Sequence, residues 1–411
     1  MSSNNAMTTA ENGLPRHVID FKFDTAGAAA ILVNVRGLHP LLKRSASEHE
    51  RIGKLTDEVV GALNSIGVFR MSTPRRWGGM RLPLRGRVDV VSEIARGCPS
   101  TGWVTVVFNI SALGISVQRP EMQRRLLADG VSRICAPGPG GGTIAPSGDK
   151  WVVNGKWSIG SGLHHANWAM VPSTSPDGNL SYVALPMSEV RIARTWAMSG
   201  MKGTGSDTII AKNVVVSSDC FTDWSKALGN DSYLYDEFLL EPTDYVATYP
   251  SFRTEMLAVL VGTVAGMLEM VVADKLRPHS GTIYQRKLDS SVYQARVGQA
   301  YSAVWAAQAI LHQASHDIDR AAEGQVIMAA SQRAENRGQV LAAVELLRSA
   351  VDNVMNLAGA SGFADDNSIQ RHWRDFCLAS RHVVWNLETG YERIGQEVLE
   401  IENGITPPFL L

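Results

Sequence analysis

The spacing of apolar residues changes twice along the chain and divides it into three parts. From about residue 27 to 130 the pattern has the 3.6-residue period of helices. The clearest helix lies in "LTDEVVGALNSIG", where Thr56 stands at the N-cap position, Asp57 begins the first turn and Gly67 follows the end. The first part is therefore predicted to be helical.

Between about residues 131 and 222 the apolar period shortens to two, which is the spacing of strands. The stretch "DKWVVNGKWSI" alternates and contains Asn154-Gly155, a pair that supplies the positive φ angles of a type I′ turn. Further strands are predicted in "LSYVALPM" and "DTIIAKNVVVS". We expect a hairpin that turns at Asn154-Gly155, within a small sheet or barrel.

From about residue 254 onward, long helical patterns return. The two clearest apolar stripes are Val297, Ala300, Val304, Ala307 and Leu311, and Val340, Val344, Leu347, Val351 and Val354. The most apolar run, from Met256 to Leu268, is too short to span a bilayer and lies between two glutamates, so it predicts a buried core helix. Helices, then strands, then helices indicate an α+β chain.

Composition and charge favour a small-molecule partner. The 411 residues are 45% hydrophobic and carry a net charge of −1 without a long run of one sign, so neither a nucleic acid nor a membrane is an expected partner. The four cysteines, Cys98, Cys135, Cys220 and Cys377, are far apart and form no CxxC. Because no signal peptide is evident either, we expect a cytoplasmic protein.

Several common functional motifs are missing. No GxGxxG follows a strand, and the chain has neither GxSxG nor HExxH. The run from Gly138 to Gly142 lacks the Lys-Ser/Thr of a phosphate loop and fits either a lid over a substrate entrance or a turn. His312 and His316 have metal-ligand spacing without a third ligand, so they indicate a polar helix face, and no metal site is expected. The pair His164-His165 is consistent with polar loop residues.

Four stretches together carry a family resemblance. They are "CPSTGWV" (98–104), "VNGKWSIGSGLHHANW" (153–168), "WAMSGMKGTGSDTIIAKNVVV" (196–216) and "LAGASGFADDNSIQRHWRDFCLASRH" (357–382). Their order and spacing resemble the acyl-CoA dehydrogenase fold. More closely, the chain resembles the oxygenase components of two-component (group D) flavin-dependent monooxygenases, such as p-hydroxyphenylacetate hydroxylase and the steroid-degrading phenol hydroxylase. The resemblance extends from about residue 40 to 408.

This resemblance implies three domains. They are an N-terminal helical domain over residues 1–130, a middle β-barrel over 131–222 and a C-terminal four-helix bundle over 223–411. It also implies a homotetramer assembled through the bundle. Reduced flavin, FMNH₂ or FADH₂, would lie between barrel and bundle, with part of the site supplied by a neighbouring subunit.

The resemblance also assigns roles to individual residues. The flavin-binding residues would be Trp157, Ser161, Gly162, Gly203, Thr204, Gly205 and Ser206. Ser161 would lie near flavin N5 and Trp157 near the ring system, and taken alone Ser161 fits an ordinary turn serine as well. His382 and Ser161 would be the catalytic residues.

One position separates two chemistries that share this fold. Many acyl-CoA dehydrogenases carry their catalytic glutamate eight residues after the aspartate of the Arg374-Asp375 pair, where this chain has Val383. A valine cannot abstract a proton, and the preceding residue is His382, where the monooxygenases keep a functional histidine. Because some acyl-CoA dehydrogenases take their base from elsewhere, a dehydrogenase of that type stays the alternative.

The implied reaction uses reduced flavin and O₂. Oxygen would add at flavin C4a, and the hydroperoxide would hydroxylate an aromatic or polycyclic molecule, or oxidise nitrogen or sulfur, in a dry pocket that holds the N5 proton. The absent nucleotide-binding motif implies a separate NAD(P)H:flavin reductase. Trp103, Ser111 and Cys135 are candidate substrate contacts. Ser111 stands about where the phenol hydroxylases have a histidine, and Cys135 stands where they have a serine, so the phenol contacts differ here.

Overall fold

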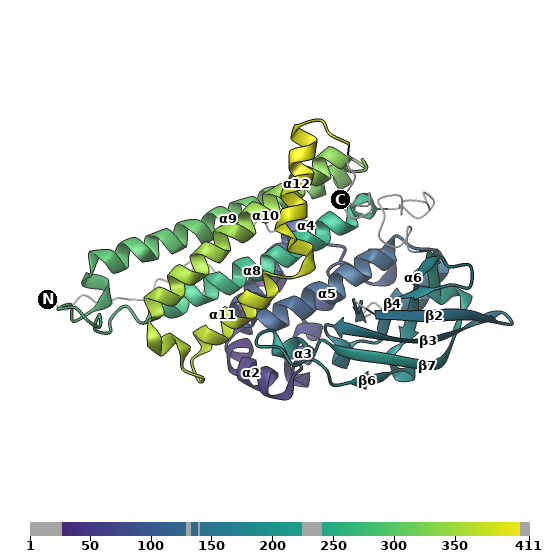
Figure 1. Ribbon diagram of the computed structural model, residues 1–411, viewed down its shortest axis with the longest axis horizontal. Coiled ribbons are helices and arrows are strands. Elements are labelled where there is room, and N and C mark those ends of the chain that lie inside the picture. The colour runs from purple at the N-terminus through teal and green to yellow at the C-terminus, as the bar shows by residue number, and fades with distance from the viewer. Residues whose placement is uncertain (1–26, 129–132, 139, 224–240, 403–411) are drawn as a thin grey trace.

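The computed structural model describes residues 27–128, 133–138, 140–223 and 241–402. Figure 1 shows long helices in one half of the molecule and the strands in the other, with α5 running between them. The boundary expected at 130–131 lies outside the described residues, as do Pro139 of the glycine-rich run and both chain ends.

The N-terminal part is helical, as its apolar period predicts. Its helices are α1 (Ala29–Gly37), α2 (His39–Ile52), α3 (Asp57–Ser65), α4 (Leu84–Gly97), α5 (Pro99–Ser116) and α6 (Pro120–Leu127), with 3-10 turns at Val68–Arg70 and Arg75–Trp77. The hydroxyl oxygen of Thr56 accepts the backbone N–H of Val59 at 3.4 Å, and Gly67 is left-handed with φ 83°. Both predicted ends of α3 are therefore confirmed.

The C-terminal part packs around one apolar helix. Its helices are α8 (Thr248–Ala273), α9 (Ser291–Glu323), α10 (Ala330–Ala358), α11 (Ser368–Ala379) and α12 (Leu387–Val398), with a 3-10 turn, η12, at Val383–Trp385. Helix α8 is long and apolar enough to cross a membrane, but 78% of its most apolar window is buried among α4, α5, α9, α10 and α11. The predicted core helix is confirmed, and the two apolar stripes lie on α9 and α10 and face inward.

Helices α4 and α8 approach each other closely at Gly262. A Cβ atom placed there would lie 2.1 Å from the backbone oxygen of Ser92. We expect Gly262→Ala to lower the free energy of unfolding by about 1–3 kcal/mol, because the backbone of α4 would have to move away. The control is Gly61→Ala on α3, where nothing lies within 4 Å and alanine should stabilise the helix by up to about 1 kcal/mol. Urea unfolding of both variants tests this, and equal stability changes would contradict the close packing.

The strands form one eight-stranded sheet. They are β1 (Ile134–Cys135), β2 (Gly140–Ser147), β3 (Lys150–Gly160), β4 (Trp168–Thr174), β5 (Leu180–Pro186), β6 (Arg191–Ala193), β7 (Asp207–Ser217) and β8 (Phe221–Asp223). The order is β6-β7-β3-β2-β4-β5-β8, with β1 beside β4. Contacts between β5 and β7, which are not neighbours in this order, show that the sheet curls back on itself. Among the described strands, β6 and β8 do not pair, so hydrogen bonds do not close the barrel fully.

The predicted turn at Asn154-Gly155 is wrong. Both residues lie inside β3, and the hairpin turns earlier, at Gly148-Asp149, where Ser147 pairs with Lys150. Gly155 is needed for packing instead, because a Cβ there would lie 2.5 Å from the indole ring of Trp157. A buried tryptophan thus decides the position of this glycine, and the local turn preference of Asn-Gly is overridden.

Candidate active site

Three segments far apart in the sequence meet at the side chain of Ser161. Ser161 directly follows the last residue of β3, and Trp103 of α5 donates its indole N–H to the Ser161 hydroxyl oxygen at 3.2 Å. The hydroxyl oxygen of Ser206 lies 2.7 Å from that of Ser161. Ser161 is 8% exposed, so its hydroxyl group and these partners lie in a largely buried part of the protein.

The loop before β7 continues these hydrogen bonds. The Thr204 hydroxyl lies 2.6 Å from the Ser206 hydroxyl and donates to the carbonyl of Met201 at 2.8 Å. The carbonyl of Thr204 accepts the backbone N–H of Gly162 at 2.8 Å. The structure therefore brings together Ser161, Gly162, Thr204 and Ser206 of the sequence-predicted flavin residues.

The glycines of this region allow close contact between the loops and helices. Gly162 is left-handed with φ 79°, and a Cβ there would lie 2.8 Å from the ring of Phe108 on α5. A Cβ at Gly203 would lie 2.9 Å from the Cβ of His49, and Gly205 is left-handed with φ 56°. Side chains at these positions would push the loop away from the helices, and the flavin contacts of these glycines stay predictions.

Asp375 of α11 anchors the loop from behind. One of its carboxylate oxygens accepts the backbone N–H of Met201 at 2.5 Å, and the other lies 3.5 Å from the hydroxyl of Ser100. Burial raises the pKa of Asp375 to about 7, and the hydrogen bond from Met201 opposes this rise. Met201 itself has a positive φ of 52°, so Asp375 stabilises a backbone conformation that few residues other than glycine adopt.

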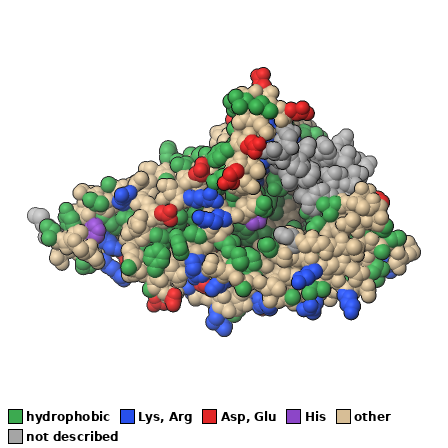
Figure 2. Space-filling view, viewed as in Figure 1, with side chains coloured by type: hydrophobic (Ala, Val, Ile, Leu, Met, Phe, Trp, Pro, Cys, Tyr) green, Lys and Arg blue, Asp and Glu red, His purple; other side chains and the backbone are tan. Residues whose placement is uncertain are grey.

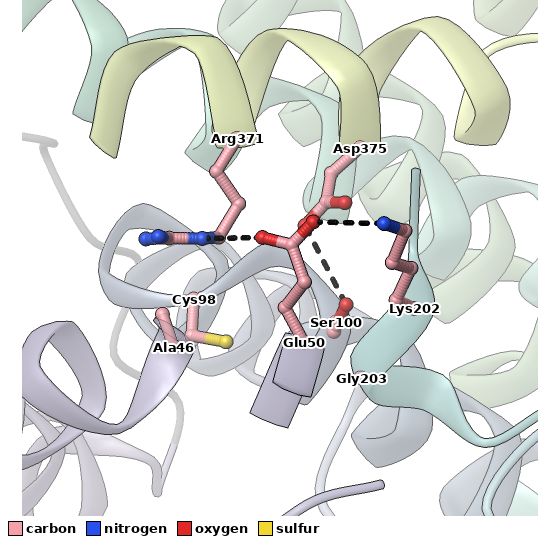
Figure 3. A pocket seen from close by; sticks show the side chains of 8 residues that line it. All are labelled: Ala46, Glu50, Cys98, Ser100, Lys202, Gly203, Arg371 and Asp375. Carbon is pink, nitrogen blue, oxygen red and sulfur yellow. Dashed lines mark hydrogen bonds and ion pairs between the residues drawn. The ribbon is translucent and has the colours of Figure 1, made fainter. Parts of the chain in front are cut away.

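A cluster of charges surrounds this anchor (Figure 3). The Glu50 carboxylate lies 2.9 Å from Arg371, 2.7 Å from Arg374 and 3.4 Å from Lys202. Burial alone would raise the pKa of Glu50, but hydrogen bonds from Arg374 and Arg371 lower it to about 2. The adjoining cavity holds only about 10 Å³, which suits one water molecule, so this cluster joins α2, α11 and the loop and does not bind a large ligand.

His382 lies against the other side of Trp103. The centres of the two rings are 5.4 Å apart in an edge-to-face arrangement, and the ring of Phe252 on α8 is 6.5 Å from His382. Burial lowers the pKa of His382 to about 4, so the ring is neutral at pH 7. Its Nδ1 accepts the backbone N–H of Val384 at 3.3 Å, which places the proton of the neutral ring on Nε2.

Open space adjoins this aromatic cluster. His382 lines a cavity of about 240 Å³ together with residues that include Arg348 and Trp385. On the face drawn in Figure 2, a recess lies between the helical half and the strand half, with hydrophobic side chains along its wall. The lining of the 240 Å³ cavity comes from the C-terminal helical part alone, and it is largely polar, with Arg348, Arg381 and Glu388 beside His382 and Trp385. A ligand in this cavity would therefore meet charged as well as aromatic side chains.

Trp157 does not join the Ser161 cluster. It is fully buried, and its indole N–H donates to the carbonyl of Pro172 at 2.7 Å inside the curled sheet. Cys135 is also fully buried; its thiol donates to the carbonyl of Trp168, and burial raises its pKa far above the ordinary value. Ser111 is half-buried on α5, two turns beyond Trp103. Of the three predicted substrate residues, the structure brings only Trp103 to Ser161 and His382.

Three other histidines named from the sequence, His164, His165 and His312, make structural contacts. His164 Nε2 lies 2.7 Å from a carboxylate oxygen of Asp207, and His165 Nε2 lies 2.9 Å from the carbonyl of Leu55. His312 pairs with Asp89 of α4 at 2.7 Å. Within the described residues, no group of three or more His, Cys, Asp and Glu side chains could hold a metal ion.

Sequence reasoning missed Met201, Asp375 and Phe252 as parts of the site. Asp375 belongs to the Arg-Asp pair, which served the prediction as part of the family motif and as the point from which to count forward to Val383. Neither its contact with Met201 nor that of Phe252 with His382 follows from local sequence, because each contact joins segments more than 100 residues apart.

The chain resembles known proteins over most of its length. Two sequence families match, the acyl-CoA dehydrogenase N-terminal domain over residues 39–131 and the acyl-CoA dehydrogenase C-terminal domain over residues 257–387. A pigment production hydroxylase of Rhodococcus sp. (strain ATCC 21145) is 27% identical over 384 residues, 90% of this chain and 96% of its own. The flavin-dependent monooxygenase oxygenase subunit HsaA of Mycobacterium tuberculosis is 25% identical over 92% of this chain and 98% of its own.

The chain belongs to the acyl-CoA dehydrogenase family. Its sequence relatives place it among the flavin-dependent monooxygenases with that fold. The structure of XiaF from Streptomyces sp. in complex with FADH₂ and glycerol has the same fold, with a TM-score of 0.87 and 24% identity, and the match covers 92% of this chain and 97% of that one. The predicted fold and the predicted enzyme class of this oxygenase are thus confirmed. In keeping with the class, Val383 at the position of the dehydrogenase glutamate is 77% exposed and carries no acid or base.

Proposed function

We propose that this oxygenase uses reduced flavin and O₂ to hydroxylate an aromatic or polycyclic small molecule, with the reduced flavin supplied by a separate NAD(P)H-dependent reductase. The observation that carries the proposal is that Ser161 and His382 both contact Trp103. The indole nitrogen of Trp103 lies 3.2 Å from the Ser161 hydroxyl oxygen, and the centres of the Trp103 and His382 rings are 5.4 Å apart. Ser161 and His382 are the predicted catalytic pair, and they come from different halves of the molecule.

The residues around Ser161 fit a reduced flavin by the chemistry of their hydrogen-bonding groups. The Ser161 hydroxyl oxygen already accepts from Trp103 and has a second lone pair available, and reduced flavin carries an N–H at N5. Ser206 and Thr204 of the loop before β7 position this oxygen, and the backbone N–H of Gly162 joins the Ser161 loop to the carbonyl of Thr204. Bound reduced flavin supplies two electrons to O₂, one oxygen atom of which enters the substrate while the other leaves as water. Ser161 would accept a hydrogen bond from the N–H at N5 and so help to keep that proton in place.

His382 acts as a hydrogen-bond donor to the substrate. Its neutral ring carries a proton on Nε2, and its pKa of about 4 makes it a weak base at pH 7. A donor at this position can hold a substrate oxygen and stabilise negative charge on it as the aromatic ring reacts. Trp103 and Phe252, which flank His382, exclude water from the reacting atoms, and this limits the competing release of hydrogen peroxide.

An aromatic substrate suits the aromatic side chains of the site, and it agrees with the substrates named for relatives of the chain. One relative is the oxygenase component of an FADH₂-dependent resorcinol hydroxylase of Rhizobium sp., 25% identical over 90% of this chain. Hydroxylation at carbon is the reaction that we favour, and oxidation at nitrogen or sulfur would be an alternative outcome of a substrate test. Ser111, half-buried on α5, is the polar group available to the far end of a substrate, since Cys135 is buried.

The oxygenase assembles as a homotetramer in the cytoplasm, and a neighbouring subunit completes the flavin site. Tyr301 and Trp305, one turn apart on α9, are 40% and 61% exposed. Large exposed apolar side chains on a bundle helix are typical of a surface that another protein covers. The four cysteines are free, which fits a reducing compartment.

Isotope incorporation tests the proposed function. The purified protein would be incubated with NADH, FAD or FMN, a flavin reductase and ¹⁸O₂, with resorcinol and indole as probes. We expect a hydroxylated product that contains ¹⁸O only when both proteins are present. Product containing oxygen from water, or rapid reduction of flavin by NADH without the reductase, would contradict the proposal.

A further inference from the structure

The hydroxyl groups behind Ser161 form a chain whose direction is fixed. It runs from the carbonyl of Met201 through the hydroxyls of Thr204 and Ser206 to that of Ser161, with successive distances of 2.8, 2.6 and 2.7 Å. Each hydroxyl has one proton to donate, and a carbonyl oxygen can only accept. The position of every proton therefore follows from the Met201 end.

Thr204 begins the sequence of donors. Its single proton goes to the carbonyl of Met201, so in its contact with Ser206 it must accept. The proton of Ser206 is thereby used on Thr204, and Ser206 in turn must accept from Ser161. The single proton of Ser161 consequently points to Ser206, away from any ligand.

The other contact of Ser161 has the same effect. The indole nitrogen of Trp103 has a hydrogen and no acceptor lone pair, so at 3.2 Å it donates to Ser161. Ser161 thus gives its only proton to Ser206 and receives one from Trp103. All that its oxygen can still offer a ligand is a lone pair.

This polarity distinguishes the two redox states of flavin. Reduced flavin has an N–H at N5, whereas oxidised flavin has a lone pair there. We infer that Thr204 and Ser206 are specificity-determining residues, which hold Ser161 as a pure acceptor and so make the site prefer reduced to oxidised flavin. The inference rests on the proposed function, since it assumes that flavin N5 faces Ser161.

Oxidised flavin could be accommodated only by reversing the chain. Ser161 would then donate to N5, Ser206 to Ser161 and Thr204 to Ser206, and the bond from the Thr204 hydroxyl to Met201 would be lost. The Met201 carbonyl would keep the indole N–H of Trp196 at 2.9 Å and the Thr204 N–H at 3.1 Å. Binding oxidised flavin therefore costs one buried hydrogen bond, which corresponds to about a 3- to 10-fold lower affinity for oxidised than for reduced flavin. The backbone N–H of Met201, bound to Asp375 at 2.5 Å, keeps the carbonyl in place.

Anaerobic binding of flavin to the full-length protein tests the inference without reference to turnover. Dissociation constants would be measured for oxidised and dithionite-reduced FMN and FAD, for the wild type and for Thr204→Val. The wild type should bind the reduced forms more tightly. In Thr204→Val, which keeps the shape of the side chain, Ser206 can donate to Ser161 and Ser161 to oxidised N5. We expect oxidised flavin to bind about 3- to 10-fold more tightly to this variant, with reduced flavin changed less than about twofold.

Two further variants complete the experiment. Ser206→Ala removes the group that accepts the proton of Ser161, so that this proton becomes available to oxidised N5. It should therefore raise the affinity for oxidised flavin relative to that for reduced flavin, as Thr204→Val does. Thr263→Val on α8 removes a buried hydroxyl that donates to the carbonyl of Val259 in its own helix, at 2.6 Å, and should leave this affinity ratio unchanged. Equal affinity of the wild type for both redox states, or an unchanged ratio in a folded Thr204→Val or Ser206→Ala, would overturn the inference alone. A wild type that binds neither form of flavin would overturn the proposed function as well.

Discussion

Replacing Ser161 with alanine is expected to divert most of the reduced flavin oxidised by this enzyme to hydrogen peroxide. The Ser161 hydroxyl is proposed to hold the N5 proton, whose loss lets oxygen leave as peroxide before it reaches the substrate. Its removal also leaves the indole N–H of Trp103 without its partner at 3.2 Å. Because a buried N–H group left without an acceptor costs about 1–3 kcal/mol, we expect the ratio of product to peroxide to fall by about 10- to 100-fold. Measuring peroxide and product in the same reaction gives this ratio directly.

A matched serine separates this effect from a general loss of stability. Ser173 lies on β4 of the same sheet, where it pairs with Ser181 of β5, and it is 1% exposed. Ser173→Ala should keep the wild-type ratio of product to peroxide. If Ser161→Ala forms product with wild-type efficiency, Ser161 does not hold the N5 proton.

Replacing His382 with alanine should lower the rate of product formation by about 10- to 100-fold, because the substrate loses a donor in a site with little water. His382→Gln, whose amide nitrogen reaches about as far as Nε2, should recover part of the rate. His316→Ala, which changes an exposed histidine of α9, is the control and should behave like the wild type.

The pH dependence separates a donor from a base. Burial lowers the pKa of His382 from 6.5 to about 4, so the neutral donor form is fully present above pH 6.5. In the folded protein it is lost only as the pH falls through about 4. We therefore expect no inflection near pH 6.5 that depends on His382. An inflection there that disappears in His382→Gln would instead identify His382 as a general base.

Local signals in the sequence predicted most of the fold but not the position of one turn. The N-cap at Thr56 and the strand at Asp207–Ser217 depend on neighbouring residues, and both agree with the structure. The turn expected at Asn154-Gly155 failed because the packing of Trp157 against Gly155 is a tertiary constraint. A local turn preference gives no information about a ring that must fit into the interior of a sheet.

In the candidate site too, local motifs predicted some features, and others depend on contacts between distant segments. The loops that carry Ser161, Thr204 and Ser206 could be named from their motifs, yet their mutual hydrogen bonds could not, because 43 to 45 residues separate Ser161 from its partners on the other loop. The tautomer of His382 also depends on geometry, since its bond to the backbone of Val384 sets the position of the proton. Residue types were therefore predictable here, whereas the direction of each proton required the folded chain.

A crystal structure of the protein prepared anaerobically with reduced flavin tests the central claim most directly. We expect the isoalloxazine between the strand half and the helical bundle, with N5 at about 2.7–3.2 Å from the hydroxyl oxygen of Ser161 and with His382 beside the substrate space. A flavin bound elsewhere, or one whose N5 faces away from Ser161, would contradict it.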